Sequence, residues 1–163
     1  MSPAPNFGNQ PRDGGHFILS EEEYQEIIKR EPEIVKWIHP YMGADEFIKG
    51  KKRYCIWLKK AQPSDIQISR ILYSKVAAVR EFRLESKAKT TNGYAKVPQL
   101  FAQITQPEDT DWLIVPSVSS ERRRYVPIGF GKKIRINMGY CLHFGIAVYL
   151  AIGIKFLFLS LFC

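Results

Sequence analysis

The sequence has little cysteine and no export signal. Its three cysteines, Cys55, Cys141 and Cys163, are odd in number, widely spaced and free of any CxxC pair. Such a set predicts neither a disulfide framework nor a zinc site. Residues 1–15 are polar and rich in proline and glycine, where a secretory signal would have an apolar stretch after a basic start. Both absences indicate a protein of the reducing cytoplasm.

Catalytic signatures are also missing. The sequence contains no phosphate-binding GxxxxGK[ST], no GxGxxG after a strand, no HExxH and no GxSxG. Its three histidines lie in unrelated segments and receive no role. Asp65, Glu85 and Lys87 superficially match a Mg²⁺-dependent nuclease, in which carboxylates hold the metal and lysine assists the attacking water. That chemistry needs the Glu-Lys pair on a strand beside the aspartate, whereas periodicity places it near the end of a helix. We therefore expect no nuclease activity from this trio.

Acidic residues are scarce where basic ones gather. Residues 1–48 carry 4 basic and 9 acidic side chains, residues 49–130 carry 16 and 7, and residues 131–163 carry 4 and none. The overall charge of +8 therefore comes from the middle and the end of the chain. A segment of net charge +9 favours a polyanionic partner, most often nucleic acid, through release of counterions. A solvated basic surface is the alternative.

A chain of 163 residues with 45% apolar and 13% aromatic residues can fold as about one domain. A helix is predicted over 21–30, because Ser20 and Glu23 form a capping box. A second, short helix is predicted over 33–39, between Pro32 and Pro40. The longest helix is expected from Ile66 to about Lys87, after the helix start at residues 63–65. Strands are predicted over 53–58, 100–104, 112–116 and 125–128, and a polar flexible loop over 89–93. These elements indicate an α+β fold with a helical lead-in, one long helix and a small, mostly antiparallel sheet.

One face of the long helix changes from apolar to basic along its length. Val76 and Val79 share this face with Arg83, which occupies the angle where another apolar residue would continue the core. A polar partner must therefore face Arg83. A phosphate or base edge is one candidate, and an internal carboxylate such as Glu81 or Glu85 is the other.

The segment between the last two predicted strands is the richest in arginine. Residues 117–125 place Ser119, Ser120 and Glu121 next to three consecutive arginines, Arg122–Arg124. Arginine can bond guanine O6 and N7, hydroxyls reach phosphates, and glutamate can accept from cytosine N4. The alternative is that these charged side chains are simply exposed to solvent and bind no partner.

The C-terminal segment differs from the rest. From Cys141 to Cys163 the chain is almost wholly apolar, and Lys132, Lys133 and Arg135 precede it as a cytoplasmic flank would. Lys155, near its middle, is costly in a bilayer. A membrane span, a buried element and a tail in an aberrant reading frame all stay open. The span would make the chain a membrane-anchored protein whose basic segment lies on anionic lipid.

Three segments carry a family resemblance: FGNQPRDGG at 7–15, AVREFR at 78–83 and PSVSSERRRYVPIGF at 116–130. In this order and spacing they resemble the target-recognition domain of MmeI-like restriction–modification enzymes, over roughly residues 6–130. The resemblance implies a piece of a longer chain that joins a nuclease, an S-adenosylmethionine-dependent adenine-N6 methyltransferase and the domain that reads the DNA site. It also implies that the sequence departs from the family after Phe130.

The resemblance implies a recognition module without catalytic residues or cofactors of its own. The Asn-Pro-Pro-aromatic motif that holds a flipped adenine is absent, so the chain alone should neither methylate nor cut DNA. S-adenosylmethionine and Mg²⁺ belong to the parent enzyme, and the partners are double-stranded DNA and the methyltransferase domain. The predicted parts are an N-terminal loop over 1–19, the recognition domain over 20–130 and a divergent tail over 131–163. The predicted DNA contacts are Arg12, Arg80, Arg83, Lys87, Lys89, Ser119, Ser120, Glu121, Arg122, Arg123 and Arg124.

Overall fold

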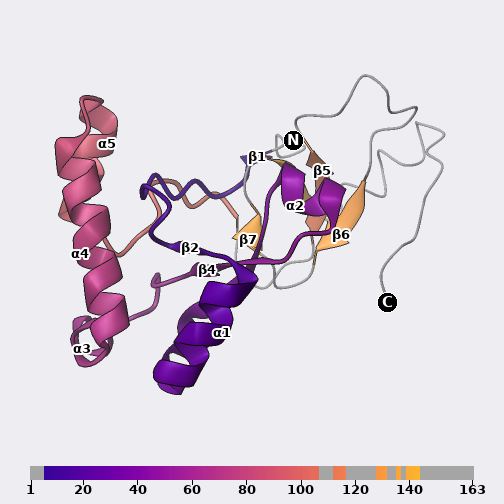
Figure 1. Cartoon of the computed structure of the whole chain (residues 1–163). Coiled ribbons are helices and arrows are strands. Elements are labelled where there is room, and N and C mark those ends of the chain that lie inside the picture. Colours follow the sequence, from indigo (N-terminus) through magenta and orange to yellow (C-terminus); the bar gives the residue numbers. More distant parts are fainter. Residues whose placement is uncertain (1–5, 107–111, 117–127, 132–134, 137–138, 144–163) are drawn as a thin grey trace.

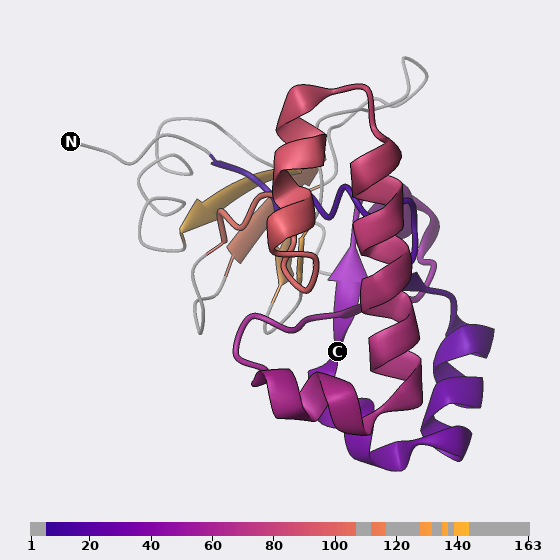
Figure 2. The same cartoon turned by 90° about the vertical axis from the view of Figure 1, so that its left-hand side faces the viewer.

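The computed structural model describes residues 6–106, 112–116, 128–131, 135–136 and 139–143. The helices α3 (Pro63–Ile68), α4 (Arg70–Glu85) and α5 (Lys89–Gly93) lie together on one side of the molecule (Figure 1). Seen from that side, α5 stands beside α4 and α3 lies at the foot of α4 (Figure 2). The strands lie beyond them, so the arrangement is α+β, as predicted.

The described strands form two small sheets. One has the order β1 (Asn6–Phe7), β8 (Gly139–His143), β5 (Trp112–Pro116), β6 (Gly129–Gly131), and all its pairs are antiparallel. The other has the order β2 (Ile18–Leu19), β4 (Arg53–Ile56), β3 (Ile38–Met42), β7 (Arg135–Ile136). Its β3–β7 pair is parallel and its other pairs are antiparallel. The mostly antiparallel character is therefore confirmed.

The core lies between α4 and the sheet of β2, β4 and β3. Leu72 and Val79 of α4 are fully buried in the same cluster as Phe17, Trp57 and Phe101. The Phe101 ring meets Trp57 edge to face at a centroid distance of 4.9 Å. Burial of apolar side chains such as these is the main favourable contribution to folding. The side of α4 that carries these residues is thereby fixed against the sheet.

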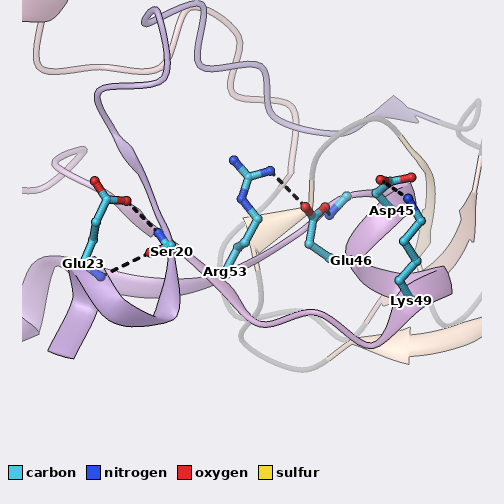
Figure 3. Close-up of polar contacts among 7 residues, drawn as sticks. Ser20, Glu23, Asp45, Glu46, Lys49 and Arg53 are labelled. Atoms are coloured by element: carbon cyan, nitrogen blue, oxygen red, sulfur yellow. Dashed lines mark hydrogen bonds and ion pairs between the residues drawn. The ribbon is translucent and has the colours of Figure 1, made fainter.

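Local capping sets the ends of the first two helices (Figure 3). In α1 (Glu21–Arg30) the Glu23 amide donates to Ser20 Oγ and the Ser20 amide donates to the Glu23 carboxylate, which confirms the predicted capping box. The helix α2 (Ala44–Lys49) was not expected. There Glu46 is buried, accepts from the Gly43 amide at 2.9 Å and pairs with Arg53 Nη1 at 2.9 Å. These bonds tie α2 to β4.

The predicted long helix is divided. Its start at Pro63 is correct, but α3 ends at Ile68 and Ser69 is extended. The Ser69 hydroxyl accepts from the Leu72 amide at 3.0 Å and donates to the Glu31 carboxylate, which also accepts from the Ile71 amide. A serine that can cap a new helix and bond a distant carboxylate has an alternative to continuing the old one. With its 16 residues, α4 is still the longest described helix.

Three predicted local structures differ from the observed ones. The short helix predicted over 33–39 is present as a 3₁₀ helix over residues 32–37, but Ile38 and His39 already belong to β3, where they pair with Ile56 and Cys55. Residues 89–93, predicted as a loop, form the helix α5, and Asn92 Nδ2 donates to the Leu84 carbonyl at 2.8 Å. Residues 100–104 make only an isolated bridge, Gln10 with Gln103.

The remaining strand predictions differ in outcome. The strand over 112–116 matches β5 residue for residue, and the strand over 53–58 is β4, which ends at Ile56. Most of the strand predicted over 125–128 lies outside the described residues. β6 crosses the boundary predicted after residue 130, and β7 and β8 pair with strands from earlier in the chain. The fold therefore continues beyond that boundary.

No helix among the described residues is both long and apolar enough to cross a membrane. The apolar C-terminal segment lies outside the described residues from residue 144 onward, and its first three residues, 141–143, belong to β8.

Candidate nucleic-acid interface

Arg83 is the largest fully buried side chain of the described structure. Its Nε donates to the carbonyl of Arg12 at 3.0 Å, and its two Nη groups donate to four more carbonyls. Those of Pro11 and Leu100 lie 2.9 and 2.7 Å from Nη2, and those of Tyr94 and Val97 lie 3.1 and 3.2 Å from Nη1. A guanidinium has five N–H donors, so every one of them is used. Arg83 therefore joins α4 to two segments that are distant in sequence.

This geometry corrects the role predicted for Arg83. The polar partner of its side chain is neither a phosphate nor a carboxylate but a ring of main-chain carbonyls. Burial lowers the pKa of Arg83, and the nearby Asp13 opposes that effect. With no free donor and no exposed surface, the group cannot contact DNA in this conformation. Arg83 holds the segments around residues 11–12 and 94–100 in position but is itself not exposed.

Buried hydrogen bonds also fix the segment 9–17. Asn9 is fully buried, donates to Gln106 Oε1 at 2.9 Å and accepts from the amides of Thr105 and Gln106. The Asp13 carboxylate, also buried, accepts from the Gly15 amide at 3.1 Å and the Phe17 amide at 2.6 Å. These two residues were missed as structural determinants, although the segment 7–15 that contains them had been singled out as a motif.

The backbone at position 14 explains why the motif at 7–15 has a glycine there. Its φ is +65°, and a Cβ at this position would lie 2.8 Å from Cδ2 of Phe82. Any other side chain would therefore be strained and would collide with the ring. The N-terminal turn and the second half of α4 consequently pack face to face. The motifs at 7–15 and 78–83 meet in space.

The remaining predicted contact residues fall into two groups. Arg80, Lys87 and Lys89 are exposed on α4, beyond its end and at the start of α5, and Arg12 is half-buried at the turn. No hydrogen bond or ion pair joins these four side chains to another described residue. Their charges are therefore available to a partner. Ser119, Ser120, Glu121, Arg122, Arg123 and Arg124 lie outside the described residues.

A shallow groove of about 550 Å³ runs along the outer face of α4. Tyr73, Ala77 and Leu84 line it from α4, Ile66 lines it from α3, and Pro98 closes one side. Tyr73 and Leu84 are 62% and 53% exposed. The groove is mainly apolar, with Arg80 and Glu81 among its polar lining residues. The apolar part of its lining is typical of a protein contact, whereas Arg80, one of its polar lining residues, is exposed.

No group of three or more histidine, cysteine, aspartate or glutamate residues among the described residues could hold a metal ion. The Asp65 carboxylate accepts from the Gln62 amide and pairs with Lys36, and both contacts hold its pKa below the usual value. Burial raises the pKa of the Cys55 thiol, so this cysteine is a packed apolar residue at neutral pH.

The family described as "MmeI, target recognition domain" matches residues 2–145. The chain belongs to this family. It is 37% identical over 128 residues to DNA methyltransferase A of Bacillus subtilis (strain 168), covering 78% of this chain and 14% of that protein. Its fold matches that of the type IIL restriction–modification enzyme MmeI, solved in complex with DNA, with a TM-score of 0.86 and 35% identity. That match covers 93% of this chain and 21% of the MmeI chain.

The sequence predicts a departure from the MmeI family pattern after Phe130, and the family match continues to residue 145. The end of the match falls two residues after β8. The strands β6, β7 and β8 therefore lie within the matched residues. The chain spans about one seventh of the methyltransferase and about one fifth of the MmeI chain.

Proposed function

We propose that this target recognition domain reads a DNA site for a restriction–modification enzyme whose catalytic parts lie elsewhere in a longer polypeptide. The observation that supports this most strongly is the match of both sequence and fold to MmeI, an enzyme solved with DNA bound. The basic middle segment, at net charge +9, supplies the electrostatic attraction that a DNA-binding surface requires. Neither the comparisons nor the described residues support the alternative of a membrane-anchored protein.

The proposed contacts divide by chemistry. Glu121, Arg122, Arg123 and Arg124 are proposed to meet base edges or phosphates, with Ser119 and Ser120 donating to phosphates. Arg80, Lys87 and Lys89 are proposed to bond the DNA backbone, because they are exposed and have no partner among the described residues. Arg83 is not among the proposed contacts, because all its donors are used inside the fold.

The proposed parent enzyme methylates adenine at N6 and carries a linked endonuclease in the cytoplasm. Its methyltransferase would use S-adenosylmethionine and flip the target adenine out of the duplex, and its nuclease would use Mg²⁺. We propose no step of this chemistry for the present chain. Its contribution is to fix where on the duplex the methyltransferase acts. The apolar groove on α4 is a surface on which the catalytic part of such a chain could pack.

Fluorescence anisotropy of the full 163-residue chain with a labelled duplex of randomised sequence tests the DNA-binding proposal. The triple variant Arg122, Arg123 and Arg124→Ala removes three charges from the proposed reading loop. A matched triple variant, Lys29, Arg30 and Lys36→Ala, removes three exposed charges from α1 and the segment after it.

The expected result is binding that weakens with salt, because each neutralised phosphate contributes a slope of about 0.9 in log K against log salt. The loop variant should lose at least tenfold more affinity than its matched control. Equal losses in the two variants would show that the effect comes from net charge alone and would contradict the assignment of this loop.

A further inference from the structure

Arg12 has an unusual backbone conformation. Its φ is +44°, and among the described residues it is the one non-glycine residue with a positive φ. Side chains disfavour this left-handed region because Cβ approaches the main-chain carbonyl too closely. Gly14 and Gly15, which also have positive φ, follow it in the same turn and bear no such cost. A glycine would be the unstrained choice at position 12, yet an arginine is present.

The surrounding structure holds Arg12 in place from three directions. Arg83 bonds the carbonyls of Arg12 and of Pro11 before it. Gln10 exchanges two main-chain hydrogen bonds with Gln103, at 2.9 and 3.0 Å. On the other side, the Asp13 carboxylate fixes the amides of Gly15 and Phe17. Several bonds therefore over-determine the strained turn, which is the condition under which strain persists.

The guanidinium of Arg12 has no such partners in the part of the chain that the structure describes. The side chain is half-buried, and no hydrogen bond or ion pair joins it to another described residue. The nearest acid in sequence, Asp13, is buried and uses both carboxylate oxygens on main-chain amides. The fold thus fixes the main chain of this residue, whereas its charge has no partner among the described residues. The contacts of the described residues do not explain why the side chain is an arginine.

We propose that Arg12 contacts a DNA phosphate from a turn that Arg83 holds in shape. Residues that keep a strained conformation cluster at binding sites, where a fixed position reduces the entropy lost on binding. A single guanidinium on a rigid turn suits a phosphate oxygen, which aligns the domain on the duplex without reading sequence. This proposal rests on the proposed DNA-binding function and adds a positioning role for Arg83.

The substitution Arg12→Gly separates binding from folding, because it removes the guanidinium and relieves the strained φ. The full chain carrying it should melt at the same temperature as the unmodified chain or up to ~3 °C above it. Its affinity for duplex DNA should fall about tenfold, and its salt slope should fall by about one, as for one lost phosphate contact. Lys29→Ala, which removes one exposed charge from α1, is the matched control and should leave the slope nearly unchanged.

The role of Arg83 is tested by combining variants. Arg83→Lys keeps the charge but cannot satisfy five carbonyls, so the turn should loosen. In that background, if it folds, Arg12→Gly should cost much less affinity than in the unmodified chain, whereas a purely structural Arg83 would give additive losses. If Arg83→Lys does not fold, the Arg12→Gly result alone decides the proposal.

The outcomes separate this proposal from the broader one. If the unmodified chain binds DNA and Arg12→Gly binds equally well with the same salt slope, the Arg12 contact is wrong while DNA binding stands. If the unmodified, folded chain does not bind DNA even at low salt, the proposed DNA-binding function is contradicted, and the Arg12 contact with it. Loss of discrimination between duplexes, rather than uniform weakening, would replace the phosphate contact with a base contact and overturn the proposal as stated.

Discussion

Arg83 has no carboxylate partner and is stabilised inside the protein by five carbonyl dipoles. Loss of these hydrogen bonds would leave buried polar groups unsatisfied, whether the guanidinium or the carbonyls are removed. Without the guanidinium, the carbonyls of Pro11, Tyr94 and Val97 keep one main-chain amide donor each, but those of Arg12 and Leu100 are left with no printed donor among the described residues. An unsatisfied buried polar group costs about 1–3 kcal/mol. The same bonds join the segments 11–12 and 94–100 to α4, so the loss would spread beyond one side chain. Arg83 is therefore a structural residue that holds these segments together.

Replacing Arg83 by methionine, which keeps much of its volume, should lower the free energy of unfolding by at least ~3 kcal/mol. Urea denaturation followed by tryptophan fluorescence measures this change. Arg80→Met, one turn earlier on the same helix, is the control and should change stability by less than about 0.5 kcal/mol, because Arg80 is exposed. Comparable stabilities for the two variants would contradict the structural role of Arg83.

At the scale of elements, a carboxylate links two helices. Glu31 ends α1, and its side chain accepts from the Ser69 hydroxyl and from the Ile71 amide in the first turn of α4. A negative charge at a helix N-terminus interacts favourably with the helix dipole and satisfies an unpaired amide. Glu31 thereby fixes where α4 begins and how α1 is oriented against it.

Changing Glu31 to glutamine keeps its shape and removes its charge, so it should destabilise the chain by about 1 kcal/mol. Thermal melting by circular dichroism should show the loss. Glu33→Gln removes an exposed charge two residues away and should have little effect. The interpretation of Glu31 as a cap would be wrong if Glu33→Gln proved the more damaging change.

The helix starts that depend on neighbouring residues could be predicted from the sequence, and those that depend on distant residues could not. The capping box of α1 was predictable because Ser20 and Glu23 lie three residues apart, as do the residues of any such box. The start of α4 was not, because Ser69 finds its partner 38 residues earlier in Glu31. Two of the partners of Arg83, the carbonyls of Pro11 and Arg12, were missed for the same reason, since they lie more than 70 residues away in the sequence. The arginine-rich connector predicted over 117–124, the most specific part of the predicted site, lies outside the described residues and stays a prediction.

At the scale of the whole molecule, the sheet of β1, β8, β5 and β6 joins the two ends of the domain. β8 lies inside this sheet, between β1 and β5, and pairs with both. A chain that ends at residue 130 would lose this strand and β7 and would cut β6 short. The edges of β1 and β5 would be left unpaired, and exposed edges promote aggregation.

A chain shortened to residues 1–145 should therefore unfold cooperatively at nearly the melting temperature of the full chain. A chain shortened to 1–130 should melt at least ~5 °C lower, or aggregate, because it loses a central strand. Differential scanning calorimetry with light scattering distinguishes these outcomes. Equal melting temperatures would show that residues 131–143 contribute nothing to the fold.

The pairing of β1 with β8 has a consequence for protein engineering. Asn6 lies opposite Cys141, and paired residues of antiparallel strands are about 5 Å apart. In a longer polypeptide, the two junctions of this unit would therefore sit next to each other. One such module could be cut out and another spliced in with little disturbance to the host. Under the proposed function, exchange of the whole unit would be a geometrically simple way to change the DNA site that the longer polypeptide reads.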